Sequence, residues 1–184
     1  MVMLKLVTIP NKILTTPTKK ITDFDDQLAR IVKDMIDVLD AQKDPPGVGL
    51  ASTQVGINKS LFIMRPTPHD KVDVCINPEI IELEKTTFED VDEENEKDEE
   101  DRKLEGCLSI PRVWSPVVRP NRVHLRYQTI TGEIKEEWFE EFKATIVQHE
   151  VDHLNGILFT RRAVEQNAPM FEERKGKLKR IKNI

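Results

Sequence analysis

Apolar residues recur along this chain with two periods, one typical of helices and one typical of strands. Residues 23–41 carry apolar side chains every three or four positions, which predicts an amphipathic helix with Asp23 as its N-cap. These apolar positions are Leu28, Ile31, Val32, Met35 and Leu39. Residues 140–154 predict a second helix. The segment 122–127 instead alternates polar and apolar residues, as a half-buried strand does.

Three further strands are predicted at 59–64, 72–83 and 133–138. Asn77-Pro78 should break or bulge the second of them, because proline has no N–H for a sheet ladder. Thr131-Gly132 is a turn that would pair 122–127 with 133–138 as a hairpin. Mixed strands with two separated helices predict an α+β fold. We expect a single domain over residues 1–184, with mainly antiparallel strands packed around one central helix, 140–154.

Composition adds limits to this picture. A chain of 184 residues suits one domain, and 38% hydrophobic with 33% charged residues is typical of a globular protein with a charged surface. No stretch approaches the roughly 20 apolar residues that span a bilayer. Residues 1–10 lack the features of a secretory signal. We therefore expect a cytoplasmic protein with no membrane partner.

Charge is distributed unevenly. Residues 89–101 hold ten carboxylates and one lysine, a local charge of −9 within a chain whose net charge is −5. Such a run cannot bury enough apolar surface to order itself, so we predict an acidic loop inserted in a mildly basic domain. The C-terminal segment 169–184 is a basic tail. Phe171, Leu178 and Ile181 could form a helical stripe there, which Gly176 weakens.

The chain's clearest chemical motif is Gln148-His149-Glu150-Val151-Asp152-His153. Histidines at i and i+4 share one face of a helix, so both imidazoles can reach one metal ion. Glu150, beside the first histidine, could act as general base on a water molecule. A surface helix that carries two histidines by chance is the alternative.

A catalytic metal needs a third ligand. The residues after His153 contain no histidine or glutamate at the spacing of the zinc peptidases. His69 lies in a proline-rich loop and His124 on the polar side of a strand, so neither is favoured. Cys107 remains, and two histidines with one cysteine and an open position form a catalytic ligand set. Cys75 fits a small buried apolar residue, and a disulfide between the two cysteines is disfavoured in the cytoplasm.

Three segments in order resemble the signature of the peptide deformylases. The first is the glycine-rich run Gly47-Val48-Gly49-Leu50-Ala51-Ser52-Thr53-Gln54, the second Glu105-Gly106-Cys107-Leu108-Ser109, and the third His149-Glu150-Val151-Asp152-His153. The resemblance spans roughly residues 6–165. Ser52 stands where the family usually has alanine, and Arg112 where glycine is common. The run before Glu105 is longer than usual. None of these departures removes a metal ligand or a proton carrier.

The resemblance implies a metal-dependent hydrolase that removes the formyl group from the N-terminal methionine of new polypeptides. It implies Cys107, His149 and His153 as metal ligands and Glu150 as the residue that moves a proton from water to the leaving amine. It further implies that the Gln54 amide and the backbone N–H of Leu108 stabilise the oxyanion. The positions implied to contact the substrate are Val48, Gly49, Glu105 and Gly106.

The resemblance also points to one divalent metal ion, with ferrous iron as the native ion. Zinc, nickel and cobalt are chemically acceptable to the same ligands, and nothing in the sequence chooses between them. Because the family acts on chains that leave the ribosome, the basic tail, 169–184, could contact ribosomal RNA.

Two other functions stay open at this point. One is a metallopeptidase of the His-Glu-x-x-His type, which would leave Cys107 and Gln54 unexplained. The other is a non-catalytic interaction protein that binds a metal only for stability. A structural metal site normally has four protein ligands, and the sequence offers no fourth candidate.

Overall fold

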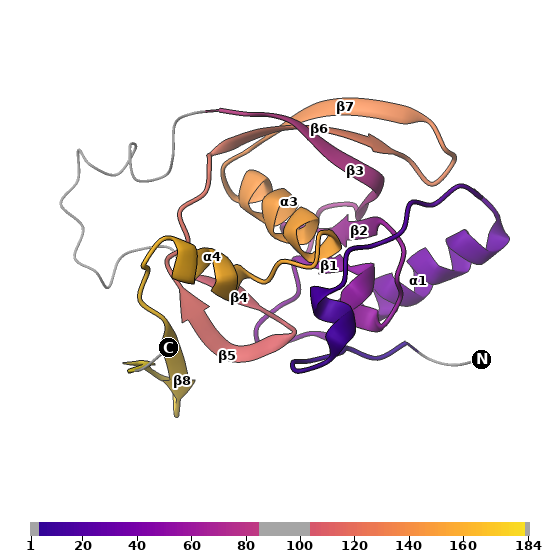
Figure 1. Ribbon diagram of the computed structural model, residues 1–184. Helices are drawn as coiled ribbons and strands as arrows, with labels where there is room; N and C mark the ends of the chain where they lie inside the picture. The colour runs from indigo at the N-terminus through magenta and orange to yellow at the C-terminus, as the bar shows by residue number, and fades with distance from the viewer. Residues whose placement is uncertain (1–3, 85–103, 183–184) are drawn as a thin grey trace.

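Helix α3 (Glu141–Leu154) runs through the middle of the molecule, with two antiparallel sheets arranged around it (Figure 1). This computed structural model describes residues 4–84 and 104–182. All residues of α3 from Ile146 to Leu154 are buried, including its histidines and acids. Buried polar groups need partners, so the surroundings of this helix must supply them. Helix α3 confirms the predicted second helix, 140–154, and its central place in the fold.

The larger sheet has five strands in the order β1-β2-β3-β6-β7, and every neighbouring pair is antiparallel. Its strands are β1 (Gly49–Ala51), β2 (Leu61–Met64), β3 (Asp73–Leu83), β6 (Arg122–Gln128) and β7 (Ile134–Glu140). The predicted hairpin is β6 with β7. The predicted bulge is also present, because the pairing of β3 with β6 shifts between Ile76 and Glu79 and Asn77 has a φ of 50°.

The two faces of this sheet pack against different helices. Phe62 and Met64 of β2 and Val123 and Leu125 of β6 belong to the core cluster that includes Val147 of α3. The intervening residues of the first strands pack instead against α1 (Asp26–Ala41), on the other face. These residues are Leu50, Leu61, Ile63 and Ile76. Strands that are buried on both faces have continuous runs of apolar residues, which is why Leu61–Met64 does not alternate polar and apolar residues.

Helix α1 begins at Asp26, three residues after the start of the predicted segment 23–41. Its N-cap is Asp25, whose carboxylate accepts a hydrogen bond of 2.9 Å from the Leu28 backbone N–H. The prediction of Asp23 as the cap was therefore wrong. Aspartate is a favoured N-cap residue at either position. Asp25 is the cap because it lies three residues before Leu28, whose backbone N–H in the first turn it accepts.

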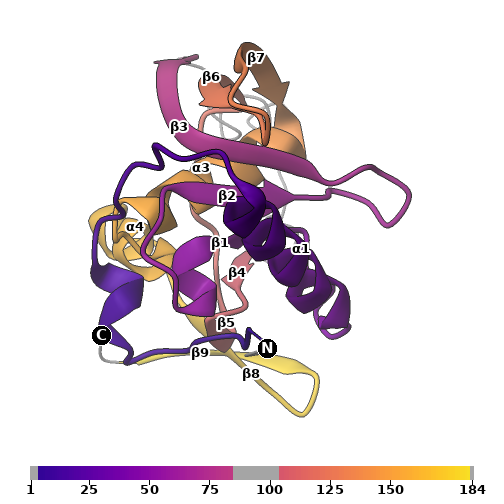
Figure 2. The ribbon, with the colours of Figure 1, turned by 90° about the vertical axis from the view of Figure 1, so that its right-hand side faces the viewer.

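The smaller sheet has four strands in the order β4-β5-β8-β9. They are β4 (Glu105–Cys107), β5 (Ile110–Ser115), β8 (Phe171–Arg174) and β9 (Lys177–Arg180). Figure 2 shows β8 and β9 as a hairpin at one end of the molecule. The helix suggested for the tail is wrong. Lys175 and Gly176 both have positive φ, 53° and 71°, which are the angles of a two-residue hairpin turn.

Short elements connect these layers. They are the 3-10 turns η1 (Lys12–Thr15) and η2 (Ser52–Val55) and the helix α4 (Phe159–Glu165). Gly156, between α3 and α4, has a φ of 72°, and a Cβ there would lie 2.7 Å from the carbonyl oxygen of Thr15. Arg112 also has a positive φ, of 63°.

Cys75 is a free, fully buried cysteine, as predicted. Within the described residues, no helix is both long and apolar enough to cross a membrane. The acidic run 89–101 lies outside the described residues, so the prediction of an acidic loop stays a prediction.

Candidate metal centre

Helix α3 and the end of β4 bring three predicted ligands together. His149 and His153 lie one turn apart on α3, and Cys107 is the last residue of β4. The Cys107 Sγ lies 3.1 Å from the Nε2 of His153, and the potential ligand atoms of all three residues lie within 4.8 Å of one another. Both histidines are buried, and Cys107 is partly buried.

The size and chemistry of this cluster fit one divalent metal ion. With bonds of about 2.0–2.3 Å at tetrahedral angles, nitrogen and sulfur ligand atoms lie about 3.3–3.8 Å apart, so side-chain shifts of about 1 Å suffice. Burial lowers the pKa of His153 well below its usual range, which keeps this imidazole neutral and able to donate a lone pair. Thiolate and imidazole are ligands that zinc and the later first-row metals accept.

Glu105 holds the outer side of the His149 ring. Its Oε1 accepts a hydrogen bond of 2.7 Å from His149 Nδ1, which leaves Nε2 as the nitrogen free for a metal. Burial would raise the pKa of Glu105, but hydrogen bonds and charges from Arg119 and His149 outweigh it and lower that pKa to about 2. The carboxylate is therefore ionised at neutral pH. A carboxylate behind a ligand histidine fixes its tautomer and its orientation.

Arg119 connects Glu105 to helix α3. It donates to Glu105 through Nε (2.7 Å) and Nη2 (2.8 Å) and to Asp152 through Nη1 (2.9 Å). Sequence reasoning missed Arg119, which lies in an irregular segment between two prolines, Pro116 and Pro120. An arginine in such a loop gives no periodic signal. Only its burial, at 5% exposed, distinguishes it from surface arginines.

Glu150 lies on the same helix beside the cluster. It is 3% exposed, and its Oε2 has no hydrogen-bond partner among the described residues. Burial raises the pKa of Glu150 to about 7, although the neighbouring His149 acts against this shift. A buried carboxylate with a free oxygen and a pKa near neutrality can both accept and return a proton.

Gln54 reaches the cluster from η2. Its Oε1 accepts a hydrogen bond of 2.8 Å from the backbone N–H of Ala51. This contact turns the amide nitrogen toward Cys107, with 3.5 Å between Gln54 Nε2 and Cys107 Sγ. Leu108 follows Cys107 directly, in the turn between β4 and β5. Gln54 in η2 and Leu108 after β4 therefore both lie next to Cys107, the first through its side-chain amide and the second as its chain neighbour.

The four residues predicted to contact substrate have distinct surroundings. A Cβ at Gly49 would lie 2.4 Å from Glu150 Oε1, and one at Gly106 would lie 2.5 Å from the ring of Trp114, so each glycine permits a close approach. The carbonyl of Val48 accepts from the N–H of Arg65 at 2.7 Å. The side chain of Glu105 is engaged by His149 and Arg119, which leaves its backbone for any substrate contact.

The other two histidines lie away from this cluster, as predicted. His69 is exposed. His124 stacks on Trp138 with 4.7 Å between ring centroids and 10° between ring planes. Neither belongs to the Cys107, His149 and His153 cluster, which is the candidate metal site found among the described residues.

Comparison with known proteins places this geometry in a family. A family model for polypeptide deformylase matches residues 3–168. The chain belongs to the peptide deformylase family. It is 37% identical over 163 residues to a peptide deformylase of Desulfotalea psychrophila, with 86% of each chain covered. It is 40% identical over 146 residues to one of Thermotoga petrophila, covering 79% of this chain and 78% of that one.

Solved structures agree with this assignment. A class I type b peptide deformylase from Acinetobacter baumannii superposes with a TM-score of 0.74 at 34% identity, covering 88% of this chain and 99% of that one. The expected α+β fold is thereby confirmed. The protein is a metal-dependent hydrolase that removes the N-terminal formyl group from newly made polypeptides. Neither the metallopeptidase nor the non-catalytic alternative is favoured.

Replacing Cys107 should weaken metal retention. In Cys107→Ser the ligand becomes a hydroxyl, which is far harder to deprotonate at neutral pH than a thiol. We expect the purified variant to lose most of its metal during dialysis, as measured by elemental analysis. Cys75→Ala is the matched control, because it removes the chain's other thiol and should keep one metal ion per chain. Full occupancy in Cys107→Ser would mean that another residue completes the ligand set.

Proposed function

We propose that Cys107, His149 and His153 hold one divalent metal ion and that the residues around it carry out the deformylation. The observation that carries this proposal is the convergence of a thiol and two imidazoles beside the buried Glu150. When bound, the metal would act as a Lewis acid toward water and the formyl oxygen. Its remaining coordination would be open, because the cluster offers three protein ligands.

Glu150 moves the proton in this proposal. Its unpartnered Oε2 accepts a proton from the attacking water, and the same oxygen then donates it to the amine that leaves as the C–N bond breaks. The pKa of about 7 that burial gives Glu150 suits both steps, because neither protonation state is strongly favoured at neutral pH. Gly49 lies directly against this carboxylate, so the substrate's formyl end can approach it without a side chain between them.

Gln54 and Leu108 stabilise the negative oxygen that develops on the formyl carbon. The amide of Gln54 is held by the Ala51 N–H and presents its nitrogen toward Cys107. The backbone N–H of Leu108 is the second donor. Preoriented donors of this kind need no rearrangement as charge develops, and losing one typically raises the barrier by about 2.7–4 kcal/mol.

The substrate's peptide backbone binds between the edges of the two sheets. Gly49 begins β1, an edge strand of the larger sheet, and Val48 directly precedes it; Glu105 and Gly106 lie in β4, an edge strand of the smaller sheet. Extended peptides bind such edges through main-chain hydrogen bonds. The new chain's formyl-methionine end is thereby directed toward the metal cluster.

Ferrous iron is the native ion in this proposal, and zinc, nickel or cobalt can replace it. The protein works in the cytoplasm, where formylated chains leave the ribosome, and its basic C-terminal tail contacts ribosomal RNA. Lys177, Lys179 and Arg180 of β9 are all exposed and would supply the positive charge for that contact.

Glu150→Gln should remove most activity while metal content and folding persist. The amide has the size of the carboxylate but cannot take a proton from water, so we expect kcat/KM for a formyl-methionyl peptide to fall by about 10²-fold or more. Glu133→Gln is the control, because Glu133 is an exposed residue in the turn that directly precedes β7. A Glu150→Gln enzyme with more than about a tenth of wild-type kcat/KM would contradict the proton-transfer role, since less than about 1.4 kcal/mol would have been lost.

Metal identity can be tested by purification without oxygen. We expect iron to predominate in protein isolated anaerobically, and we expect its activity to decay faster in air than that of nickel- or zinc-reconstituted protein. Both ferrous iron and its thiolate ligand are oxidisable. Equal half-lives of the iron and nickel forms in air, or zinc as the main metal in anaerobic preparations, would count against iron.

The ribosome contact should depend on charge in β9. Truncating the tail would also remove Met170, which is buried in the core, so charge substitution is the cleaner test. Changing Lys177, Lys179 and Arg180 to glutamine should reduce salt-sensitive co-sedimentation with ribosomes and leave turnover of a short peptide unchanged. The control changes three exposed cations elsewhere, Arg30, Lys33 and Lys43. Co-sedimentation that is equal in both triple variants would refute the role of β9.

A further inference from the structure

The inner face of the short helix α4 lies beside the metal cluster. Phe159 is 1% exposed, and its ring centroid lies 6.2 Å from that of His149 with 26° between the planes. Three residues later, Arg162 donates to both carboxylate oxygens of Asp152, through Nη2 at 2.7 Å and Nε at 3.1 Å. Residues three apart share a helix face. One face of α4 therefore supplies an apolar contact to a candidate ligand and an ionic contact to the ligand helix.

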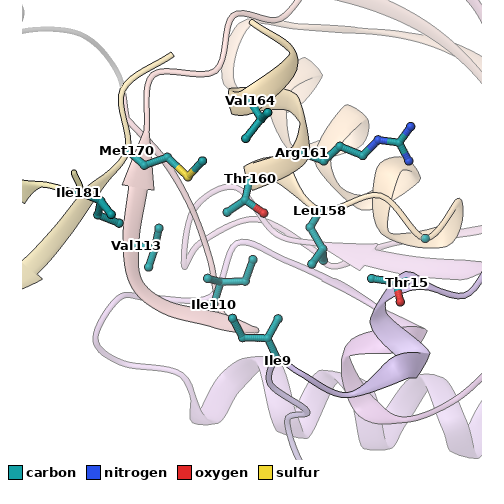
Figure 3. Close-up of a pocket in the computed structure, with 11 residues that line it drawn as sticks. Ile9, Thr15, Ile110, Val113, Leu158, Thr160, Arg161, Val164, Met170 and Ile181 are labelled. Atoms are coloured by element: carbon teal, nitrogen blue, oxygen red, sulfur yellow. The ribbon is translucent and has the colours of Figure 1, made fainter. Parts of the chain in front are cut away.

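The outer face of α4 has different surroundings. Thr160, Arg161 and Val164 border an apolar groove of about 610 Å³, which Figure 3 shows, and none of the three metal-cluster residues lines it. In Figure 3 the Arg161 side chain extends away from the groove. Arg161 donates to Glu165 on its own helix at 2.9 Å. Arg162 also donates to Glu165, through Nη1 at 3.3 Å, so the two adjacent arginines share this partner. Of the two, only Arg162 has a further hydrogen bond to α3 among the described residues.

A continuous chain of hydrogen bonds leads from Arg162 to the His149 ring. Oδ2 of Asp152 accepts from both Arg162 and Arg119. Arg119 binds Glu105 with two further N–H groups, and Glu105 accepts from Nδ1 of His149. Every link is 3.1 Å or shorter.

The charges of the four ionised side chains in this hydrogen-bonded series balance. Glu105 and Asp152 are two carboxylates whose side chains are 7% and 8% exposed, and Arg119 and Arg162 are the two guanidinium groups that neutralise them. Without Arg162, the single guanidinium of Arg119 would have to serve both buried carboxylates. An uncompensated buried charge is costly, so Arg119 would move toward Asp152 and weaken its two hydrogen bonds to Glu105.

We propose that Arg162 is a positioning residue for the metal centre. Acting through Asp152 and Arg119, it fixes the hydrogen bond between Glu105 and His149 and so slows the loss of the metal. This rests on the proposed ligand role of His149. Groups that orient a ligand histidine from outside typically change metal affinity by 10–100-fold when removed. With a side chain 36% exposed, Arg162 can be replaced without opening a cavity in the core.

The measurement is the rate of zinc release. Protein reconstituted with zinc is mixed with an excess of a coloured chelator, and the release rate is followed for wild type, Arg162→Gln, Arg162→Lys and the matched control Arg161→Gln. We expect release from Arg162→Gln to be about tenfold faster than from wild type, release from Arg161→Gln to stay within about twofold, and Arg162→Lys to be intermediate. Equal release from Arg162→Gln and Arg161→Gln would overturn the proposal.

A double-mutant cycle tests the route. If Arg162 acts through Asp152, then Asp152→Asn should also speed zinc release, and adding Arg162→Gln to it should bring no further increase. Multiplying effects in the double variant would overturn the proposal, because they would show that Arg162 acts independently of Asp152.

A purely structural role for Arg162 is tested separately. Urea unfolding of the metal-free proteins gives the stability of each variant. Zinc release that follows those stabilities across all variants, Arg161→Gln included, would overturn the proposal, because α4 would then only stabilise the fold. A wild-type protein that fails to bind one zinc ion would instead refute the proposed metal site itself.

Discussion

The hydrogen bond between Glu105 and His149 is the contact on which the rest of the site depends. It joins the smaller sheet, through β4, to the central helix α3, and it does so within the buried interior. A charged carboxylate at this place is tolerable only because Arg119 binds it with two N–H groups. Arg119 in turn needs Asp152, and Asp152 needs Arg162. Glu105, Arg119, Asp152 and Arg162 therefore form one network of charged groups that begins at His149.

This network explains how a helix with so many polar residues can lie at the centre of the molecule. The apolar side of α3, with Ala144, Val147 and Val151, packs against the larger sheet as an ordinary core helix does. Its other side carries His149, Glu150, Asp152 and His153, each of them buried. Burial strengthens the electrostatic interactions among these groups, and the ion pairs of Asp152 with Arg119 and Arg162 offset part of the cost of burying its charge.

Sequence alone predicted the elements that have long periodic patterns. Helices α1 and α3 and strand β6 were predicted from the spacing of their apolar residues, and strands β2 and β3 were predicted as well. Strand β7 was predicted as the hairpin partner of β6 because the Thr131-Gly132 turn separates them. The strands β1 and β4 are three residues each, too short for any period, and they had no prediction as strands although both hold motif residues. Three apolar residues of the C-terminal segment fit a helical stripe, but the positive φ angles of Lys175 and Gly176 form a turn, so the segment is a hairpin.

The site was predicted to the extent that its residues lie in motifs. The pairing of His149 with His153 follows from helix geometry, whereas the approach of Cys107 to them depends on strand packing that no local pattern encodes. Arg119 and Arg162 had no motif at all, and their importance follows from burial and from partners distant in sequence. Interactions that orient a ligand are long-range and charge-dependent, so a local reading of the chain finds the groups that react more readily than the groups that hold them in place.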